Sequence, residues 1–287
     1  MTLLVRGPLS ELLDFVRRDR LSGAGAILLA TLVLLCLFGP WLPLGDPEEI
    51  GIGPRLSVPA SGWLLGTDEL GRSVLPRIVD GLRSTFLLAG TAVVLTGLFG
   101  TLIGLVAAYA GGFVDMTIMR LVDILFAFPP LLLGILIAAA LGPGGTSAIL
   151  AIALITLPLF VRVVRAVALS VAARSYVIAA EVSGAGFLRV ILVHLLPNVL
   201  GAVIIQLTYA LSIGMLVESE LSFLGLGVQP PDASLGSLLR LGSVYLTIAP
   251  WLVFPAGLLL ATAILSVNLL GDGLRDMIDP LRGRPLR

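Results

Sequence analysis

Five long stretches of this 287-residue sequence carry no charged side chain, and they limit its fold more than any other feature. A helix needs about 20 apolar residues to cross the ~30 Å hydrocarbon core of a bilayer, and a charge left inside that core is costly. Hydrophobic residues make up 57% of the chain and charged residues 13%, more apolar surface than a soluble core of this length can bury. The sequence therefore predicts an all-α integral membrane protein whose spans come from Leu21–Gly45, Ser84–Val114, Ile124–Val161, Val190–Val217 and Leu241–Gly271.

The third stretch, Ile124–Val161, is too long for one crossing. Its segment Leu141–Gly145 reads Leu-Gly-Pro-Gly-Gly, which breaks a helix because proline lacks a backbone donor and glycine favours turns. We therefore expect a helical hairpin here and six transmembrane helices in all. The prolines Pro129 and Pro130 either kink the first helix of the hairpin or mark its beginning, and we favour the later beginning.

The arginines indicate the orientation, because positively charged loops stay on the cytoplasmic side. With both termini in the cytoplasm, thirteen of the eighteen arginines lie inside, and the outer segments keep Arg55, Arg72, Arg77, Arg83 and Arg240. Asp115, Arg120 and Asp123 then fall between the second and third spans, where we expect a cytoplasmic turn held by charge pairs.

The predicted spans divide the chain into five parts. Residues 1–20 form a cytoplasmic segment, in which Leu9, Leu12, Leu13 and Val16 share one face of an amphipathic helix lying on the membrane; a frayed polar tail is the alternative. The apolar stretch that follows is longer than that of a secretory signal, so we expect the first span, 21–45, to be retained. An extracytoplasmic loop (46–83), a transmembrane core (84–271) with a cytoplasmic loop at about 162–195, and a cytoplasmic tail (272–287) complete the division.

The outer segment Glu218–Arg240 fits neither a solvated linker nor a span. It contains Phe223–Gly227, which is too apolar for a linker, followed by the pair Pro230-Pro231, which breaks any crossing helix. We expect this segment to re-enter the membrane or to dock on its surface.

The residues that are missing exclude several kinds of chemistry. All basic residues are arginine, so the chain has no lysine for a Walker A phosphate site or a Schiff base. One cysteine, Cys36, and one histidine, His194, cannot form a zinc finger or a multi-histidine metal site, and no nucleophile motif accompanies them. Zero net charge argues against nucleic-acid binding. We therefore expect no catalytic residue, metal or cofactor bound by this chain, and we assign His194 to packing.

The cytoplasmic loop has the pattern of a docking element. Small residues, among them Ala179 and Ala180, precede a glycine break at Gly184 and a second short apolar segment at Phe187-Leu188. A helix faced with small residues can be approached closely by a partner, and glycine permits the sharp turn between the two segments.

This loop resembles the EAA loop of ABC importer permeases, in which two alanines, a glycine and a later Leu-Pro define the coupling helix that fits into the ATPase subunit. Three more segments are similar to the dipeptide, oligopeptide and nickel permease family, in its C-type subunit: Gly66–Arg72, Glu218–Pro231 and Asn268–Asp276. The resemblance covers most of the chain and implies a type I ABC importer permease fold.

The resemblance also implies partners and a location. They are a homologous B-type permease subunit, two ATP-binding subunits that use ATP and Mg, an extracytoplasmic substrate-binding protein, and the lipid of the bacterial inner membrane. The implied function is import of di- or oligopeptides. A nickel or other small-solute importer is the alternative, and a stand-alone secondary transporter or channel is the alternative of a different class.

By the same resemblance, candidate site residues fall into three groups. The ATPase-coupling group comprises Ala179, Ala180, Glu181, Gly184, Ala185, Phe187, Leu188, Arg189 and Pro197. Ile178 stands where the family usually has a glutamate, and we expect Glu181, on nearly the same helical face, to replace it.

The other two groups rest on polar residues in or near the spans. Asn198, Gln206 and Asn268 are candidates for the translocation path, with interhelical packing as the alternative. Asp68, Glu69 and Arg72 are candidates for contact with the binding protein, with an exposed turn held by local ion pairs as the alternative.

Overall fold

The apolar stretches form a bundle of long helices. The computed structural model describes residues 20–278, and its regular elements there are helices, with only isolated β-bridges besides them. In chain order they are α2 (Arg20–Phe38), the 3₁₀ turn η1 (Gly39–Trp41), α3 (Val74–Ala110), α4 (Gly112–Ala127), α5 (Pro130–Leu141), α6 (Gly145–Ala172), α7 (Ser175–Val182), α8 (Phe187–Arg189), the π-helical segment η2 (Val190–Leu195), α9 (Leu196–Phe223), α10 (Leu235–Val244), the 3₁₀ turn η3 (Pro250–Leu252) and α11 (Phe254–Ile278).

Five segments are long and apolar enough to cross a membrane, which confirms the predicted all-α membrane fold. They are Arg20–Trp41, Val74–Ala110, Gly145–Ala172, Phe187–Phe223 and Pro250–Ile278. The amphipathic helix predicted for residues 1–20 and the end of the predicted tail, residues 279–287, lie outside the described residues.

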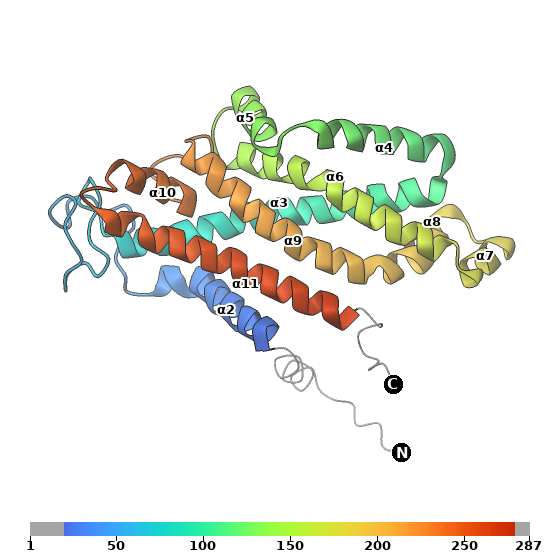
Figure 1. The fold of residues 1–287 in the computed structure, drawn as a ribbon, viewed down its shortest axis with the longest axis horizontal. Coiled ribbons are helices and arrows are strands. Elements are labelled where there is room, and N and C mark those ends of the chain that lie inside the picture. Colours follow the sequence, from blue (N-terminus) through green and yellow to red (C-terminus); the bar gives the residue numbers. More distant parts are fainter. Residues whose placement is uncertain (1–19, 279–287) are drawn as a thin grey trace, which may run out of the picture.

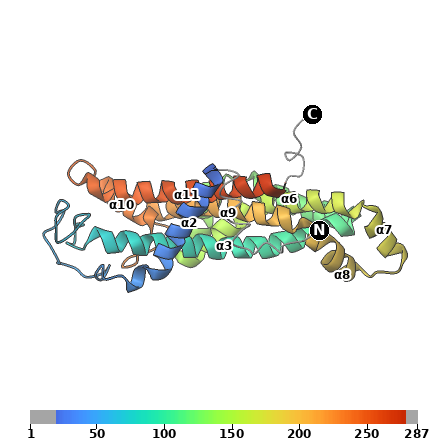
Figure 2. The ribbon, with the colours of Figure 1, turned by 90° about the horizontal axis from the view of Figure 1, so that it is seen from below.

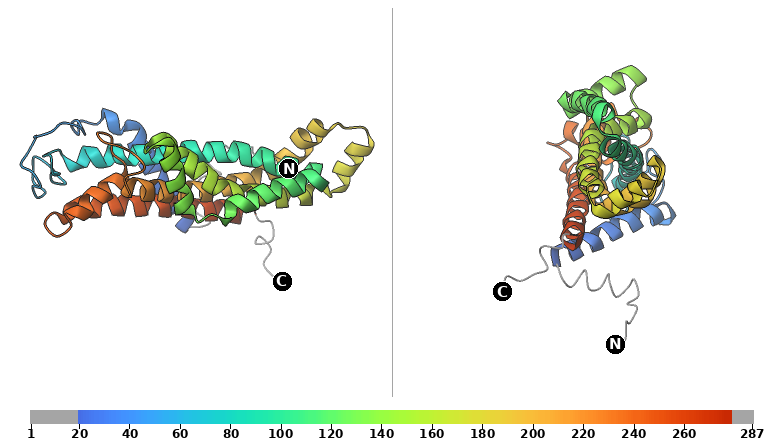
Figure 3. Two further views of the ribbon diagram at one scale, coloured as in Figure 1. Left: turned by 90° about the horizontal axis from the view of Figure 1, so that it is seen from above. Right: turned by 90° about the vertical axis from the view of Figure 1, so that its right-hand side faces the viewer.

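The long helices α3, α6, α9 and α11 lie side by side along the long axis of the molecule (Figure 1). Helix α9 packs against α3, α6 and α11, and α2 packs on the outside of α11. Helices α7 and α8 project at one end, which we call the α7 end, whereas α10 and the loop of residues 42–73 lie at the other, the α10 end (Figure 2). Viewed along the bundle, α4 and α5 form a separate layer beyond α6 (Figure 3).

Helices α3 and α6 approach closely because α3 presents glycines to α6. A Cβ atom on Gly100 would lie 2.7 Å from the ring of Phe160, and one on Gly104 would lie 2.9 Å from Val164. Phe160 is fully buried in this contact. A hydrogen bond of 2.9 Å between the hydroxyls of Thr96 and Thr156 joins the same two helices, as expected for helices that associate in lipid.

The third apolar stretch forms the predicted hairpin, with one difference. Helix α5 begins at Pro130, which confirms the later beginning, and the break falls at Gly142–Gly144 before α6. However, α5 has 12 residues, and about 18 Å of helix is too short to cross a bilayer alone. It is joined to α4 by a bend of 92°, and a sixth span exists only if this bent pair is counted as one.

The turn predicted around Asp115, Arg120 and Asp123 is wrong, because these residues lie in the 16-residue helix α4. The two carboxylates form ion pairs with another helix: Asp115 accepts hydrogen bonds from two guanidinium nitrogens of Arg165, and an oxygen of Asp123 lies 2.7 Å from a guanidinium nitrogen of Arg162. Both arginines belong to α6, which continues to Ala172, beyond the apolar stretch.

Other helix ends also depart from the hydropathy pattern. Helix α3 begins at Val74, ten residues before the apolar stretch, so Arg77, Asp80 and Arg83 lie in a helix rather than in a loop. The last span begins later than predicted, because α10 ends at Val244 and α11 begins at Phe254. The segment expected to re-enter or dock, Glu218–Arg240, begins in the last residues of α9 and ends inside α10, which packs against α9 and α3.

Candidate functional site

The loop at the α7 end is anchored on one side and exposed on the other. Val177 in α7 is fully buried among residues of α3, α6 and η2. The other face of the loop presents large apolar side chains: Ile178 is 50% exposed, Leu188 69% and Val182 84%. An anchored helix with an exposed apolar face at the tip of the molecule is suited to docking on a partner.

The chain reverses between α7 and α8 at Gly184, whose φ of 86° is unfavourable for residues with a side chain. The Gly184 N–H donates to the carbonyl of Glu181 at 2.9 Å, and the Ala185 N–H donates to that of Ala180 at 3.0 Å. These bonds close the end of α7. The glycine break predicted from the sequence is therefore the turn between the two short helices.

Tyr109, at the end of α3, connects this loop to the bundle. Its ring centre lies 5.1 Å from that of Phe187 in α8, and its hydroxyl interacts with the carboxylate of Glu181 in α7. His194 in η2 lies beside Tyr176, with ring centres 6.4 Å apart, which agrees with a packing role. Of the remaining coupling candidates, Ala180 and Ala185 are half-buried, whereas Ala179, Arg189 and Pro197 are exposed.

At the α10 end, Asp68, Glu69, Arg72 and Arg77 form a polar group that we call the Asp68 cluster. Asp68 is 1% exposed and Arg72 is 7% exposed, so the prediction of an exposed turn is wrong for these two residues. Asp68 accepts hydrogen bonds from the N–H groups of Leu70 and Arg72 at 2.9 Å and from the Arg72 guanidinium at 2.7 Å. The paired charges thus hold the loop together from inside.

Glu69 is less completely paired than Asp68. One carboxylate oxygen lies 3.5 Å from Arg72, and the other, Oε2, is buried without a hydrogen-bond partner among the described residues. Burial raises the pKa of Glu69 above its ordinary value, and Asp68 beside it adds to the shift. Of the three residues proposed for contact with a binding protein, only Glu69 keeps appreciable exposure.

Sequence reasoning missed a second polar group, the Glu218 cluster, formed by Glu218, Thr85, Ser219, Ser222 and Ser234. Glu218 is fully buried, and it accepts hydrogen bonds from Ser222 at 2.7 Å and Thr85 at 2.8 Å. Thr85 in turn accepts the N–H of Leu235 at 3.2 Å. The cluster joins α9 to α3 and to the start of α10. The only signal in the sequence was a set of hydroxyl residues around one glutamate at the end of an apolar stretch.

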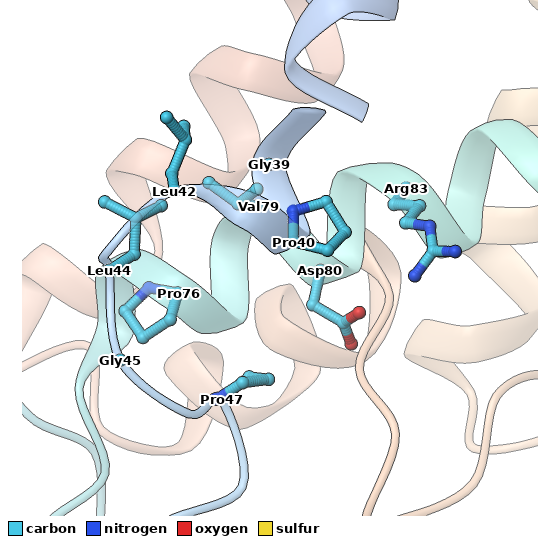
Figure 4. A pocket seen from close by; sticks show the side chains of 10 residues that line it. All are labelled: Gly39, Pro40, Leu42, Leu44, Gly45, Pro47, Pro76, Val79, Asp80 and Arg83. Atoms are coloured by element: carbon cyan, nitrogen blue, oxygen red, sulfur yellow. The ribbon is translucent and has the colours of Figure 1, made fainter. Parts of the chain in front are cut away.

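A cavity of about 250 Å³ separates the end of η1 from the first turns of α3 (Figure 4). Its wall is mostly proline, glycine and aliphatic side chains, with Asp80 and Arg83 on the α3 side. Arg77 donates to the carbonyl of Pro47 at 3.1 Å and so ties the outer loop to α3 next to this cavity.

The three amides predicted for a translocation path are not brought together. Asn198 is exposed and donates to the carbonyl of His194 at 2.8 Å, Gln206 is 8% exposed, and Asn268 is half-buried in α11. No hydrogen bond among the described residues joins any two of them. Residues 20–278 also contain no group of three or more His, Cys, Asp or Glu side chains placed to hold a metal ion.

Comparisons with known proteins agree with this architecture. Residues 100–284 match the family described as binding-protein-dependent transport system inner membrane component. The dipeptide transport system permease protein DppC of Haemophilus influenzae is 37% identical over 286 residues, covering 98% of this chain and 97% of the relative. The di/tripeptide transport system permease protein DppC of Pseudomonas aeruginosa is 38% identical, covering 97% and 94%.

A solved structure of the MetNI methionine ABC transporter, in an inward-facing conformation, shares the fold. The two chains superpose with a TM-score of 0.59 at 17% sequence identity, covering 71% of this chain and 98% of the other. This likeness confirms the type I fold inferred from the sequence. The helical bundle, the family match and the full-length relatives together show that this chain belongs to the binding-protein-dependent transport system inner membrane components, as an ABC importer permease of the C-type dipeptide and oligopeptide kind.

Proposed function

We propose that this chain forms half of the translocation path of an ATP-driven importer of di- or oligopeptides and that the loop at its α7 end docks on a separate ATPase subunit. A B-type permease chain forms the other half, two ATP-binding subunits hold ATP and Mg, and an extracytoplasmic binding protein delivers the substrate. This chain's part is conformational, since closure of the ATPase dimer alters the packing of the spans.

The observation that carries this proposal is the exposed apolar face of α7 and α8. Val182 is 84% exposed and Leu188 is 69% exposed, and adjacent large apolar side chains with this much exposure mark an interaction surface. The buried Val177 and the stacked pair Tyr109–Phe187 connect that face to α3. A displacement of α7 by a partner would therefore be transmitted directly to α3.

The arginines support a cytoplasmic position for the α7 end, with both termini on that side. Arg174 and Arg189 belong to the loop there, and Arg162 and Arg165 lie in the second half of α6, which leads to it. Arg20 is the first residue of α2, and Arg275 lies in the last turn of α11. The α10 end instead carries many acids, including Asp46, Glu48, Glu49 and Asp232. This distribution follows the rule that positive segments remain in the cytoplasm.

Peptide is the substrate class that the relatives favour. The two full-length relatives are named for dipeptide and di/tripeptide transport. Identity of 37–38% over nearly the whole chain supports a shared class of substrate, though not one particular peptide.

The docking role is tested with Val182→Glu in the assembled complex. A carboxylate placed in the apolar contact should lower both co-purification of the ATPase and ATP-dependent peptide uptake at least about tenfold, since a hot-spot residue of an interface contributes about 2 kcal/mol or more and about 1.4 kcal/mol is tenfold. The matched control is Val244→Glu, because Val244 is 71% exposed at the α10 end. Wild-type co-purification of the Val182→Glu variant would contradict the proposal.

Glu181 is proposed to supply the carboxylate that Ile178 cannot. Both residues are exposed on α7, and Glu181 already contacts the Tyr109 hydroxyl. Unchanged peptide-stimulated ATPase activity in the Glu181→Ala complex would show that this carboxylate has no part in coupling.

A further inference from the structure

Three polar residues of α9 share one face of the helix, and two of them are exposed. Asn198, Tyr209 and Glu220 follow one another at intervals of eleven residues. Eleven residues are three turns of helix with a small offset, so the three side chains lie on one face, roughly 16 Å apart. Asn198 and Glu220 are exposed, and the Tyr209 hydroxyl donates to Asp272 at 2.7 Å on the exposed surface.

Around Glu220 this face widens into a groove of about 370 Å³, the α9 groove. Its walls are apolar and come from four helices: Leu131 of α5, Leu216 and Phe223 of α9, Leu239 of α10 and Leu260 of α11. The volume is within the usual range of small-ligand sites, which are mostly apolar with a few polar groups.

Glu220 is the one carboxylate that lines this groove. Two residues away, Glu218 points into the protein and is bonded by serine and threonine hydroxyls. The Glu220 carboxylate, in contrast, makes no hydrogen bond or ion pair with the described residues. An unpaired charge on a membrane-spanning helix faces water or a cationic ligand, because it is costly against lipid.

We propose that Glu220 binds the α-ammonium group of the transported peptide in the α9 groove. Every free peptide carries this group whatever its side chains, and a carboxylate pairs with it through charge-assisted hydrogen bonds. The apolar walls accept side chains of varied shape by contact alone. The site rests on the proposed peptide import, and it assigns to this chain a direct contact with the substrate.

The test uses the complete transporter in lipid vesicles and labelled alanyl-alanine as the probe. Glu220→Gln keeps the size of the side chain but removes its charge, and it should lower the initial rate of uptake about tenfold while the ATPase remains bound. Glu220→Asp keeps the charge and should recover most of the rate. Glu49→Gln, the same change at an exposed acid of the outer loop, should transport as wild type does.

A second measurement reports on access to the site. In a Cys36→Ser background, Glu220→Cys in the complex in lipid nanodiscs should react with a water-soluble maleimide, and alanyl-alanine with ATP should slow that reaction. A thiol that does not react would show that lipid or the second permease covers the groove, and would overturn the site.

The outcomes separate the site from the function on which it rests. Wild-type uptake of alanyl-alanine together with undiminished uptake by Glu220→Gln would overturn the site alone. Failure of the wild-type complex to take up alanyl-alanine would overturn the peptide assignment and the site with it.

Discussion

The neighbouring carboxylates Asp68 and Glu69 show how strongly one position in a turn changes the surroundings of a charge. Asp68 is enclosed by the backbone N–H groups and the guanidinium that it accepts, whereas Glu69 has one oxygen buried without a partner. A buried polar atom without a partner is costly, and the cost is greatest when the group is charged.

The raised pKa of Glu69 predicts a pH-dependent stability. The folded protein holds this proton more tightly than the unfolded chain, whose ordinary pKa is 4.5. Ionisation therefore opposes folding, and the contribution of Glu69 to stability decreases as the pH rises from that value through the folded-state pKa. Relative to Glu69→Gln, the wild type should be more stable at about pH 4 than at about pH 8.

Thermal unfolding in detergent, followed by tryptophan fluorescence, measures this difference. Glu49→Gln is the control, because Glu49 is exposed and its replacement should shift stability equally at both pH values. A stability difference between wild type and Glu69→Gln that does not change with pH would contradict the raised pKa.

At the scale of elements, the Glu218 cluster determines how α3, α9 and α10 meet. One carboxylate gathers hydroxyls from α3 and α9, and the Thr85 hydroxyl also receives the first N–H of α10. Glu218→Ala would leave several buried hydroxyls without an acceptor, so we expect a loss of about 3 kcal/mol or more in unfolding free energy.

Denaturant unfolding in detergent measures this loss. Glu220→Ala, on the exposed side of the same helix, should change the free energy by less than about 0.5 kcal/mol. Equal effects of the two substitutions would show that the cluster does not contribute specially to the packing.

The sequence predicted the helices better than their ends. Apolar stretches located the spans, and Pro130 and Gly142 marked where α5 begins and ends, because proline and glycine act locally. Polar residues lie inside the helices where they pair with residues distant in sequence: Asp115 with Arg165, and Thr85 with Glu218. Hydropathy takes no account of ion pairs, so each predicted span ended at the first charged residue. The turn at Gly184 was predicted because a glycine break is local, whereas the burial of Asp68 depends on distant residues and was not predicted.

At the scale of the whole molecule, the two ends differ in charge and should lie on opposite sides of the membrane. We expect the α7 end in the cytoplasm. In a Cys36→Ser background, a membrane-impermeant thiol reagent applied to intact cells should label Ser61→Cys, in the outer loop, and leave Ser183→Cys, between α7 and α8, unlabelled. Both serines are exposed, so access of the reagent decides the result. The reverse pattern would invert the orientation.

The length of α3 has a mechanical consequence. Its 37 residues form one uninterrupted helix, with Arg77 near its beginning and Tyr109 near its end. Such a helix is about 55 Å long, nearly twice the thickness of the hydrocarbon core. A rigid rod of this length that tilts by about 10° displaces its far end by roughly 10 Å. A small rotation imposed through Tyr109 would therefore become a large movement at the opposite membrane surface, as in a lever arm, without any change in the helix itself.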